Sequence, residues 1–304
     1  PRCRNAFDFV PKLNPGDLVG RQYEVVGALA HGGLGWIYLA RDKAVSDRWS
    51  VLKGLLDSGD EAAMAVAVAE RRYLAEIEHP NIVKIFNFVT HAGAGYIVME
   101  YVGGPSLKQI LKQRREANAG EADPLPVAQA IAYVLEILPA VGYLHGVGLL
   151  YCDFKPDNVI QTEEQLKLID LGAVRRVDDR HSPIYGTIGY QAPEIGTDGP
   201  SVASDLYTVG RALAVMSFPF DFRGRYRESL PDPEEQPLLR RHESFHRFLL
   251  RAAHRDPEAA VRSLAHVEVL VAVLAGEDLG AEAQRQPPGR DDEEEPYLLF
   301  LEAG

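Results

Sequence analysis

The first third of the chain carries short runs of β-branched and aromatic residues, separated by glycine or polar turns. Such runs predict successive antiparallel strands, because these side chains suit a half-buried pleated sheet. Between the third and fourth runs, residues 61–78 are rich in Ala and Glu and contain neither Pro nor Gly, which predicts a helix. The predicted strands cover residues 23–29, 36–41, 51–55, 82–90 and 96–101.

The pattern changes after Gly103 and Gly104. From residue 106 onward the apolar positions recur over longer stretches, most clearly at 126–145, and these predict helices. The expected fold is therefore α+β and bilobal, with a small antiparallel sheet lobe that carries one main helix and a larger, mainly helical lobe. A cleft between lobes is a common place for a ligand. We expect a lead-in segment at 1–22, the lobes at 23–103 and 104–275, and a flexible, acidic, Pro- and Gly-rich tail at 276–304.

Charge and composition narrow the classes of function. The 304 residues, of which 46% are apolar, suffice to bury a full core. A net charge of −12 argues against a nucleic-acid partner or an anionic membrane surface. No run approaches the roughly 18 apolar residues of a membrane span, and two cysteines suit a reducing compartment, so we expect a cytoplasmic protein. The chain starts at Pro1 without a signal segment after it, which we interpret as a trimmed boundary.

The strongest chemical signal is a D-x-K-x-x-N spacing formed by Asp153, Lys155 and Asn158, followed by Asp170 and Gly172 after a strand-like run. A lone Asp in a loop is usually a turn residue. Together, however, these residues supply a base for a hydroxyl proton, a cation for phosphoryl oxygens, and two hard oxygen donors for Mg²⁺. The combination predicts transfer of the ATP γ-phosphate to a hydroxyl group.

Weaker signals lie in the predicted sheet. Gly32 and Gly35 stand between the first two strands, where backbone N–H groups can approach phosphates, although such glycines are more often only a turn. Ala30 occupies the first position of the G-x-G-x-x-G pattern. Lys53 alone could be a solubilising charge at a strand edge, but Glu70 in the predicted helix can pair with it. An ion pair of this kind would hold Lys53 beside the α- and β-phosphates.

These motifs, with Ala192-Pro193-Glu194 after them, resemble the eukaryotic-type protein kinase family over about residues 20–260. Three segments, 30–40, 96–104 and 166–174, are more specifically similar to the actinobacterial protein kinase G group. The resemblance implies a bilobal fold, Mg-ATP as the donor (with Mg²⁺ or Mn²⁺ as the ion) and a protein substrate. Pro156 after Lys155, and Thr187 ahead of Ala192, match the serine/threonine branch.

The resemblance also assigns roles to residues. Asp205 would brace the catalytic loop from below, and Val51 stands where many kinases have Ala, which would narrow the adenine slot. The catalytic residues would be Asp153, Lys155, Lys53 and Glu70, and the metal ligands Asn158 and Asp170. The ATP-binding residues would be Ala30, Gly32, Gly35, Ile37, Val51, Lys53, Met99, Glu100, Val102 and Ile160.

The sequence departs from the family pattern at two further positions, and Cys3 carries a separate inference. Cys152 replaces the Arg that would grip a phosphorylated activation loop, so activity should not need phosphorylation of that loop. We interpret Cys152 as a small buried side chain rather than a redox switch. Ala260 stands where the family has an Arg paired with the residue matching Glu194, and Arg262 is a possible substitute. Cys3 resembles the remnant of a rubredoxin-like knuckle and, with one thiol, should hold no metal.

Two alternatives stay open at this stage. A pseudokinase, which would bind nucleotide or a partner without transfer, is favoured by Ala30, Val51 and Ala260. A small-molecule kinase is less consistent with residues 191–194, which suit a platform for a protein substrate. The main prediction is an active serine/threonine protein kinase whose partners are ATP and a protein with a Ser or Thr acceptor.

Overall fold

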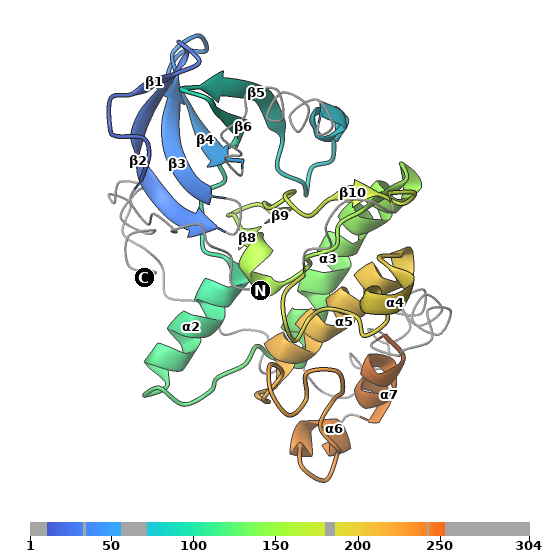
Figure 1. The fold of residues 1–304 in the computed structure, drawn as a ribbon. Helices are drawn as coiled ribbons and strands as arrows, with labels where there is room; N and C mark the ends of the chain where they lie inside the picture. Colours follow the sequence, from blue (N-terminus) through green and yellow to red (C-terminus); the bar gives the residue numbers. More distant parts are fainter. Residues whose placement is uncertain (1–10, 33–34, 56–71, 180–185, 242, 253–304) are drawn as a thin grey trace, which may run out of the picture. The chain divides into compact units, whose positions relative to one another are not determined.

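The computed structural model describes residues 11–32, 35–55, 72–179, 186–241 and 243–252 (Figure 1). Among these residues the chain divides into two compact units. Unit 1 comprises the residues up to Glu78 together with Val83–Tyr101, and unit 2 comprises His79–Ile82 and the residues from Val102 onward. Each unit is described by itself.

Unit 1 contains a six-stranded antiparallel sheet in the order β1-β2-β3-β4-β6-β5, whose long central strands are strongly curved (Figure 1). All five predicted strands are present. The described part of the predicted helix 61–78 contains the 3-10 helix η1, Arg72–Glu76, and the part before it lies outside the described residues. The strands are β1 Leu18–Val19, β2 Tyr23–Gly32, β3 Gly35–Asp42, β4 Arg48–Gly54, β5 Ile85–His91 and β6 Ala94–Glu100.

The register of the sheet separates its two faces. Tyr38, Leu52 and Val98 are paired in register, so they share one face, and they belong to the buried core of this unit. Residues 11–22, expected as a lead-in, contribute Leu13 and Val19 to the same core. The Leu13 backbone N–H donates to the Tyr38 hydroxyl at 3.3 Å, which fixes the segment on this face.

Unit 2 is mainly helical and includes four short strands. Two of its helices begin with a capping box, because the Ser106 and Ser201 hydroxyls each accept from the third backbone N–H of the helix. The predicted helix 126–145 is α3. The elements are α2 Leu107–Ala117, α3 Val127–Gly146, β7 Leu149–Leu150, η2 Pro156–Asn158, β8 Val159–Gln161, β9 Leu166–Leu168, β10 Arg175–Arg176, α4 Ile195–Asp198, α5 Val202–Ser217, α6 Pro237–Arg241 and α7 Glu243–Ala252.

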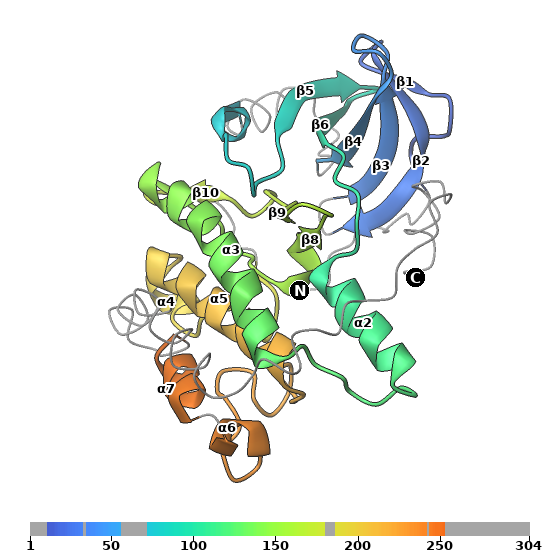
Figure 2. The same cartoon turned by 180° about the vertical axis from the view of Figure 1, so that it is seen from behind.

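Helix α5 lies at the centre of unit 2 and is buried along nearly its whole length. Helices α3 and α7 pack on it, and α3 runs beside it in both views (Figures 1 and 2). By length and composition α3 could cross a bilayer. Its apolar residues, however, are buried against the neighbouring elements of unit 2, as expected for a core helix. The loop between β7 and β8, which carries the D-x-K-x-x-N residues, rests on this pair of helices.

Candidate active site

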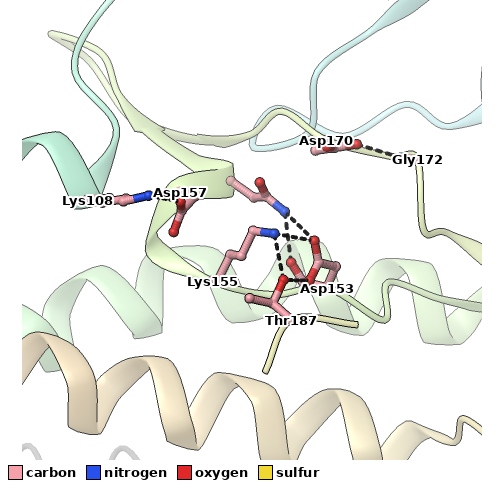
Figure 3. A network of polar contacts seen from close by, with 8 residues as sticks. Lys108, Asp153, Lys155, Asp157, Asp170, Gly172 and Thr187 are labelled. Atoms are coloured by element: carbon pink, nitrogen blue, oxygen red, sulfur yellow. Dashed lines mark hydrogen bonds and ion pairs between the residues drawn. The ribbon is translucent and has the colours of Figure 1, made fainter. Parts of the chain in front are cut away.

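The loop between β7 and β8 gathers polar side chains around Asp153 (Figure 3). The Lys155 Nζ donates to Asp153 Oδ2 at 2.6 Å, and the Asn158 amide donates to the Asp153 backbone oxygen at 2.9 Å. The Thr187 hydroxyl donates to Asp153 Oδ1 at 2.7 Å and accepts from Lys155 Nζ at 2.8 Å. The structure therefore brings together Asp153, Lys155 and Asn158, and adds Thr187 from more than thirty positions along the chain.

This arrangement has a definite chemical capacity. The Thr187 hydroxyl shows that Asp153 can accept a hydrogen bond from an aliphatic alcohol at its Oδ1. A general base needs such a position within hydrogen-bond reach of the proton that it removes. Lys155 lies beside both the carboxylate and the alcohol, where a cation can also stabilise negative oxygens. The side chains of Asp153 and Lys155 remain partly exposed, at 17% and 18%, so solutes can reach them.

Asp205 on α5 holds the start of the same loop. Its carboxylate accepts from the backbone N–H groups of Tyr151 and Cys152, both at 2.7 Å, and lies 2.9 Å from His145 Nε2. Cys152 adopts φ +67°, in the left-handed region that a residue with a side chain rarely occupies. Two adjacent N–H groups fixed on one carboxylate stabilise this turn, which presents Asp153 outward. The role that the resemblance implies for Asp205 agrees with these contacts.

The residues before Asp153 are buried and uncharged. Burial first, and then the negative charges of Asp170 and Asp153, raise the pKa of the Tyr151 hydroxyl well above its usual value. Burial likewise raises the pKa of the Cys152 thiol. The thiol is free and buried, and a thiol rather than a thiolate is a poor nucleophile. This environment agrees with the interpretation of Cys152 as a small core side chain.

Asp170 follows β9 and begins the Asp-Leu-Gly turn. Its Oδ1 accepts from the Gly172 backbone N–H at 2.7 Å, which orients the carboxylate (Figure 3). The backbone N–H of Ile169 donates to the Asn158 backbone oxygen at 3.0 Å, so the segments that carry Asn158 and Asp170 are adjacent. An amide oxygen and a carboxylate fit Mg²⁺, which in nucleotide sites takes one or two protein oxygens and completes its shell with phosphates and water. Within the described ranges no group of three or more His, Cys, Asp or Glu side chains could hold a metal on its own.

The segment after Asp170 is anchored by its own ion pair. Arg175 in β10 donates to the Asp179 backbone oxygen at 2.7 Å and lies 3.4 Å from its carboxylate. The Arg175 side chain is 7% exposed and that of Asp179 is 22% exposed, so the pair is partly shielded from water. β10 also pairs with β7, directly before the catalytic loop. Ser182, which also lies between Asp170 and Glu194 in the sequence, is outside the described residues.

Lys53 lies in β4 and is 6% exposed. It is paired in register with Ile37 on β3 and Ile97 on β6, on the face opposite the Tyr38 core. Val51, two residues earlier, shares this face with Met99 across the sheet. The predicted Lys53, Ile37, Val51 and Met99 are thus placed on one surface of unit 1. Glu70, the expected partner of Lys53, lies outside the described residues.

The glycine-rich segment differs from its expected form. Strands β2 and β3 continue to Gly32 and Gly35, which are paired in register, so little loop separates them. Ala30 is paired with Ile37 within the ladder. Gly35 adopts φ +132°, which favours glycine. The predicted connection over residues 30–35 is therefore largely taken up by the two strands of a long hairpin.

The remaining predicted ATP-binding residues lie in or near strands of the two units. Glu100 closes β6, where its backbone N–H donates to the Lys84 oxygen at 2.8 Å. Val102, 6% exposed, and Ile160 in β8, 4% exposed, belong to unit 2. Cys3 and Ala260 lie outside the described residues.

Two site contacts were not found by reasoning from the sequence. His145 reaches Asp205 from the last turn of α3, and Lys108 on α2 pairs with Asp157 of the catalytic loop at 2.6 Å. Neither residue carries a local signal, because each contact depends on how a helix packs against the loop. A basic residue in the last turn of a helix is more simply explained by the helix dipole.

Comparison with known proteins places these observations in a family. A model of the protein kinase domain matches residues 23–232. The serine/threonine-protein kinase PknG of Mycobacterium leprae is 54% identical over 282 residues, which cover 91% of this chain and 35% of the relative. PknG of Mycolicibacterium smegmatis is 55% identical over 263 residues, which cover 84% of this chain and 33% of the relative. The chain therefore spans about a third of the length of these relatives.

Solved structures agree on the fold. The kinase domain of Mycobacterium tuberculosis PknI superposes with a TM-score of 0.65 at 25% identity, and the match covers 87% of this chain and 99% of that chain. A double mutant of the same domain gives a TM-score of 0.66 at 23% identity, with 87% and 100% covered. The predicted α+β kinase fold and the resemblance to the protein kinase G group are both confirmed. The chain belongs to the protein kinase domain family.

Proposed function

We propose that this domain is a serine/threonine protein kinase that transfers the γ-phosphate of ATP to a hydroxyl group of a protein. The observation that carries the proposal is the contact of an alcohol with Asp153 beside Lys155, at 2.7 Å and 2.8 Å respectively. The relatives described above are named serine/threonine-protein kinases, which supports the same acceptor class.

In the proposed reaction, the acceptor hydroxyl takes the position at Asp153 Oδ1 that Thr187 now contacts. Its oxygen forms a bond to the γ-phosphorus while the bond from that phosphorus to the β,γ-bridging oxygen breaks and ADP leaves. Asp153 accepts the hydroxyl proton, and Lys155 stabilises the negative phosphoryl oxygens. Asn158 and Asp170 would hold Mg²⁺ through their side-chain oxygens. When bound, the ion neutralises charge on the phosphates.

We assign nucleotide binding to the other predicted residues. In unit 1, Lys53 would contact the α- and β-phosphates, with Glu70 as its ion-pair partner. The backbone of the glycine-rich hairpin would approach the phosphates. The proposed ATP-binding residues are Ala30, Gly32, Gly35, Ile37, Val51, Lys53, Met99 and Glu100 in unit 1, and Val102 and Ile160 in unit 2.

We further propose that activity needs no phosphorylation of the segment between Asp170 and Glu194. Cys152 offers no cation for a phosphate, and the buried cation of Arg175 is already matched by Asp179 within the same segment. A carboxylate in this place can do electrostatically what an added phosphate does in other kinases. A net charge of −12 supports a protein substrate rather than nucleic acid, and we propose a cytoplasmic location.

The direct test is phosphate transfer from labelled ATP to a generic protein substrate. Asp153→Asn removes the base and keeps its shape, so we expect a loss of transfer of about 100-fold or more, with nucleotide binding unchanged. Asp123→Asn, on a partly exposed Asp paired with Arg114, is the matched control and should transfer normally.

Three outcomes would contradict the proposal. A folded wild type that binds Mg-ATP and transfers nothing would identify a pseudokinase, the alternative favoured by Ala30, Val51 and Ala260. Transfer to a small molecule but to no protein would identify a small-molecule kinase. Equal activity of Asp153→Asn and wild type would exclude Asp153 as the base.

A further inference from the structure

Arg211 on α5 is the bulkiest fully buried side chain of the described residues, with no exposed surface. Within the described part of the chain its guanidinium is not paired with a carboxylate. It instead donates to three backbone oxygens, those of Gly189 at 2.9 Å, Tyr226 at 2.6 Å and Ser229. Burying a cation costs several kcal/mol unless hydrogen bonds offset the lost hydration. Because burying this cation is costly, its three contacts need a structural or functional explanation.

The three oxygens come from two separate irregular segments. Gly189 belongs to the segment that precedes Ala192-Pro193-Glu194, whereas Tyr226 and Ser229 belong to the connection between α5 and α6. The guanidinium also lies 5.3 Å from the ring centroid of Phe220 in that connection. Because its planar fork holds several donors in fixed directions, one Arg can tie both segments to α5.

The two segments also touch each other directly. Gly189 adopts φ +91°, and a Cβ at this position would overlap the Phe222 backbone oxygen. The rings of Tyr190 and Phe222 pack edge to face at 5.3 Å between centroids. The contact between residues 189–190 and Phe222 therefore depends on glycine geometry as well as on Arg211.

The anchored segment leads directly to the proposed catalytic group. The backbone N–H of Tyr190 donates to the Thr187 oxygen at 3.0 Å, which forms a tight turn. The Thr187 hydroxyl in turn contacts Asp153 and Lys155. Ile188, within this turn, is 59% exposed, so the segment offers a surface beside the proposed catalytic carboxylate.

We propose that Arg211 is a positioning residue for the acceptor substrate: it fixes residues 187–190 and 222–229 as one rigid wall next to Asp153. The inference rests on the proposed kinase function. Arg211 would not touch the substrate or ATP, and it would act through the Gly189 carbonyl and the Thr187 turn. Arg211 would thereby hold the segment 187–194 from α5. The resemblance to the family implies a different anchor at Glu194, an Arg at the position where this sequence has Ala260.

The test compares steady-state kinetics of Arg211→Met with wild type, varying the protein acceptor and ATP separately. Met fills much of the volume but leaves three carbonyls without their donor. We expect the KM for the acceptor to rise about tenfold, with the KM for ATP unchanged. A purely structural role would lower kcat through a smaller folded fraction and leave both KM values alone. Arg211→Lys keeps the charge and should restore part of the acceptor KM.

Because Arg211→Met could fail to fold, a second pair of variants perturbs the same wall at Gly189 and leaves Arg211 in place. Gly189→Ala introduces the overlap with Phe222, whereas Gly120→Ala introduces a Cβ at a similar φ of +87° with no atom within 4 Å. We expect Gly189→Ala to reproduce the change in acceptor KM and Gly120→Ala to behave as wild type. Unchanged acceptor KM in both Arg211→Met and Gly189→Ala would overturn the proposal.

Amide hydrogen exchange separates this proposal from the kinase proposal, because it needs no phosphate transfer. In Arg211→Met or, if that variant does not fold, in Gly189→Ala, exchange should accelerate together in residues 187–190 and 222–229 and stay constant in α2. If the wild type transfers no phosphate but this joint acceleration occurs, the kinase assignment fails and the wall remains. If transfer occurs and exchange is unchanged, the wall is wrong.

Discussion

Two carboxylates in unit 2, the buried Asp205 and the partly buried Glu194, have opposite surroundings. Asp205, 2% exposed, accepts from two backbone N–H groups and lies 2.9 Å from the His145 ring. Glu194 has a buried Oε2 that meets no hydrogen-bond donor among the described residues. The backbone N–H groups at the start of the β7–β8 loop and the Asp205 carboxylate on α5 thus satisfy one another. At the end of the segment between Asp170 and Glu194, the Glu194 Oε2 atom lacks a hydrogen-bond donor of this kind within the described part of the chain.

The difference distinguishes a carboxylate whose hydrogen-bond donors come from neighbouring described residues from one whose buried oxygen has no such donor. A buried carboxylate that accepts several hydrogen bonds can stay ionised. Without such donors, loss of hydration destabilises the charged form more than the neutral form. Burial accordingly raises the pKa of Glu194. The resemblance to the family implies an Arg as the partner of this residue, and the sequence has Ala260 in place of that Arg. We therefore expect the two carboxylates to respond to mutation in opposite directions.

The largest effect is expected for Asp205→Ala. The change leaves the Tyr151 and Cys152 N–H groups buried without an acceptor, so we expect a loss of about 4 kcal/mol in the free energy of unfolding. Asp221→Ala is a matched control, since Asp221 also accepts two backbone N–H groups, both at 2.9 Å, but on an exposed residue. The control should lose about 1 kcal/mol.

Chemical denaturation of both variants measures these differences. Equal losses would mean that burial does not distinguish Asp205 from Asp221, and the comparison with Glu194 would lose its basis. Circular dichroism before denaturation checks that each variant starts from a folded state.

A smaller effect, on phosphate transfer, is expected for a change at the start of the segment between Asp170 and Glu194. There, Arg175 and Asp179 form a partly shielded ion pair. Asp179→Asn removes the carboxylate charge but keeps the backbone oxygen that Arg175 contacts at 2.7 Å. We expect phosphate transfer to fall about three- to tenfold, the range of a partly buried, charge-assisted hydrogen bond. Asp178→Asn, in an exposed pair with Arg176, should have no effect.

This measurement uses protein whose segment between Asp170 and Glu194 carries no phosphate, as verified by mass spectrometry. Full activity of unphosphorylated Asp179→Asn would contradict the electrostatic role of Asp179. Activity of wild type only after phosphorylation of this segment would contradict the proposal that Cys152 makes it unnecessary.

The sequence predicts the local parts of this domain well. The five strands and α3 follow from side-chain periodicity, and Asp153, Lys155 and Asn158 meet because they lie within six consecutive residues. The extension of β2 and β3 to Gly32 and Gly35 was missed, because Ala30, His31 and Gly32 carry no strand alternation. A local sequence pattern does not predict strand residues that are stabilised by pairing with a neighbouring strand.

Long-range contacts are where prediction from the sequence fails. Arg211 follows a glycine in an apolar helix and gives no sign that it contacts Gly189, which is 22 positions away, or Ser229. Its partners are backbone oxygens, which have no signature in side-chain identity. The His145–Asp205 and Lys108–Asp157 contacts are comparable, since each forms only once a helix has packed against a distant loop or helix.

The smallest effect is expected for Glu194→Gln, and its sign decides the comparison. Because burial raises the pKa of Glu194 above its ordinary value of 4.5, the ionised form is disfavoured in the folded state. Wild-type stability should therefore fall as pH rises from about 4.5 through the raised pKa. Gln carries no charge, so the variant should be equal to or slightly more stable than wild type at pH 7.5.

Thermal unfolding at pH 4 and pH 7.5, with Glu163→Gln as the exposed control, measures this effect. The gap between variant and wild type should close at pH 4, where Glu194 is protonated in both folded and unfolded states. A loss of about 3 kcal/mol or more at pH 7.5 would instead indicate that a cation pairs with Glu194, since removing one partner of a buried ion pair has that effect. Arg262 would then be the residue to substitute next, and Asp205 and Glu194 would turn out to be satisfied alike.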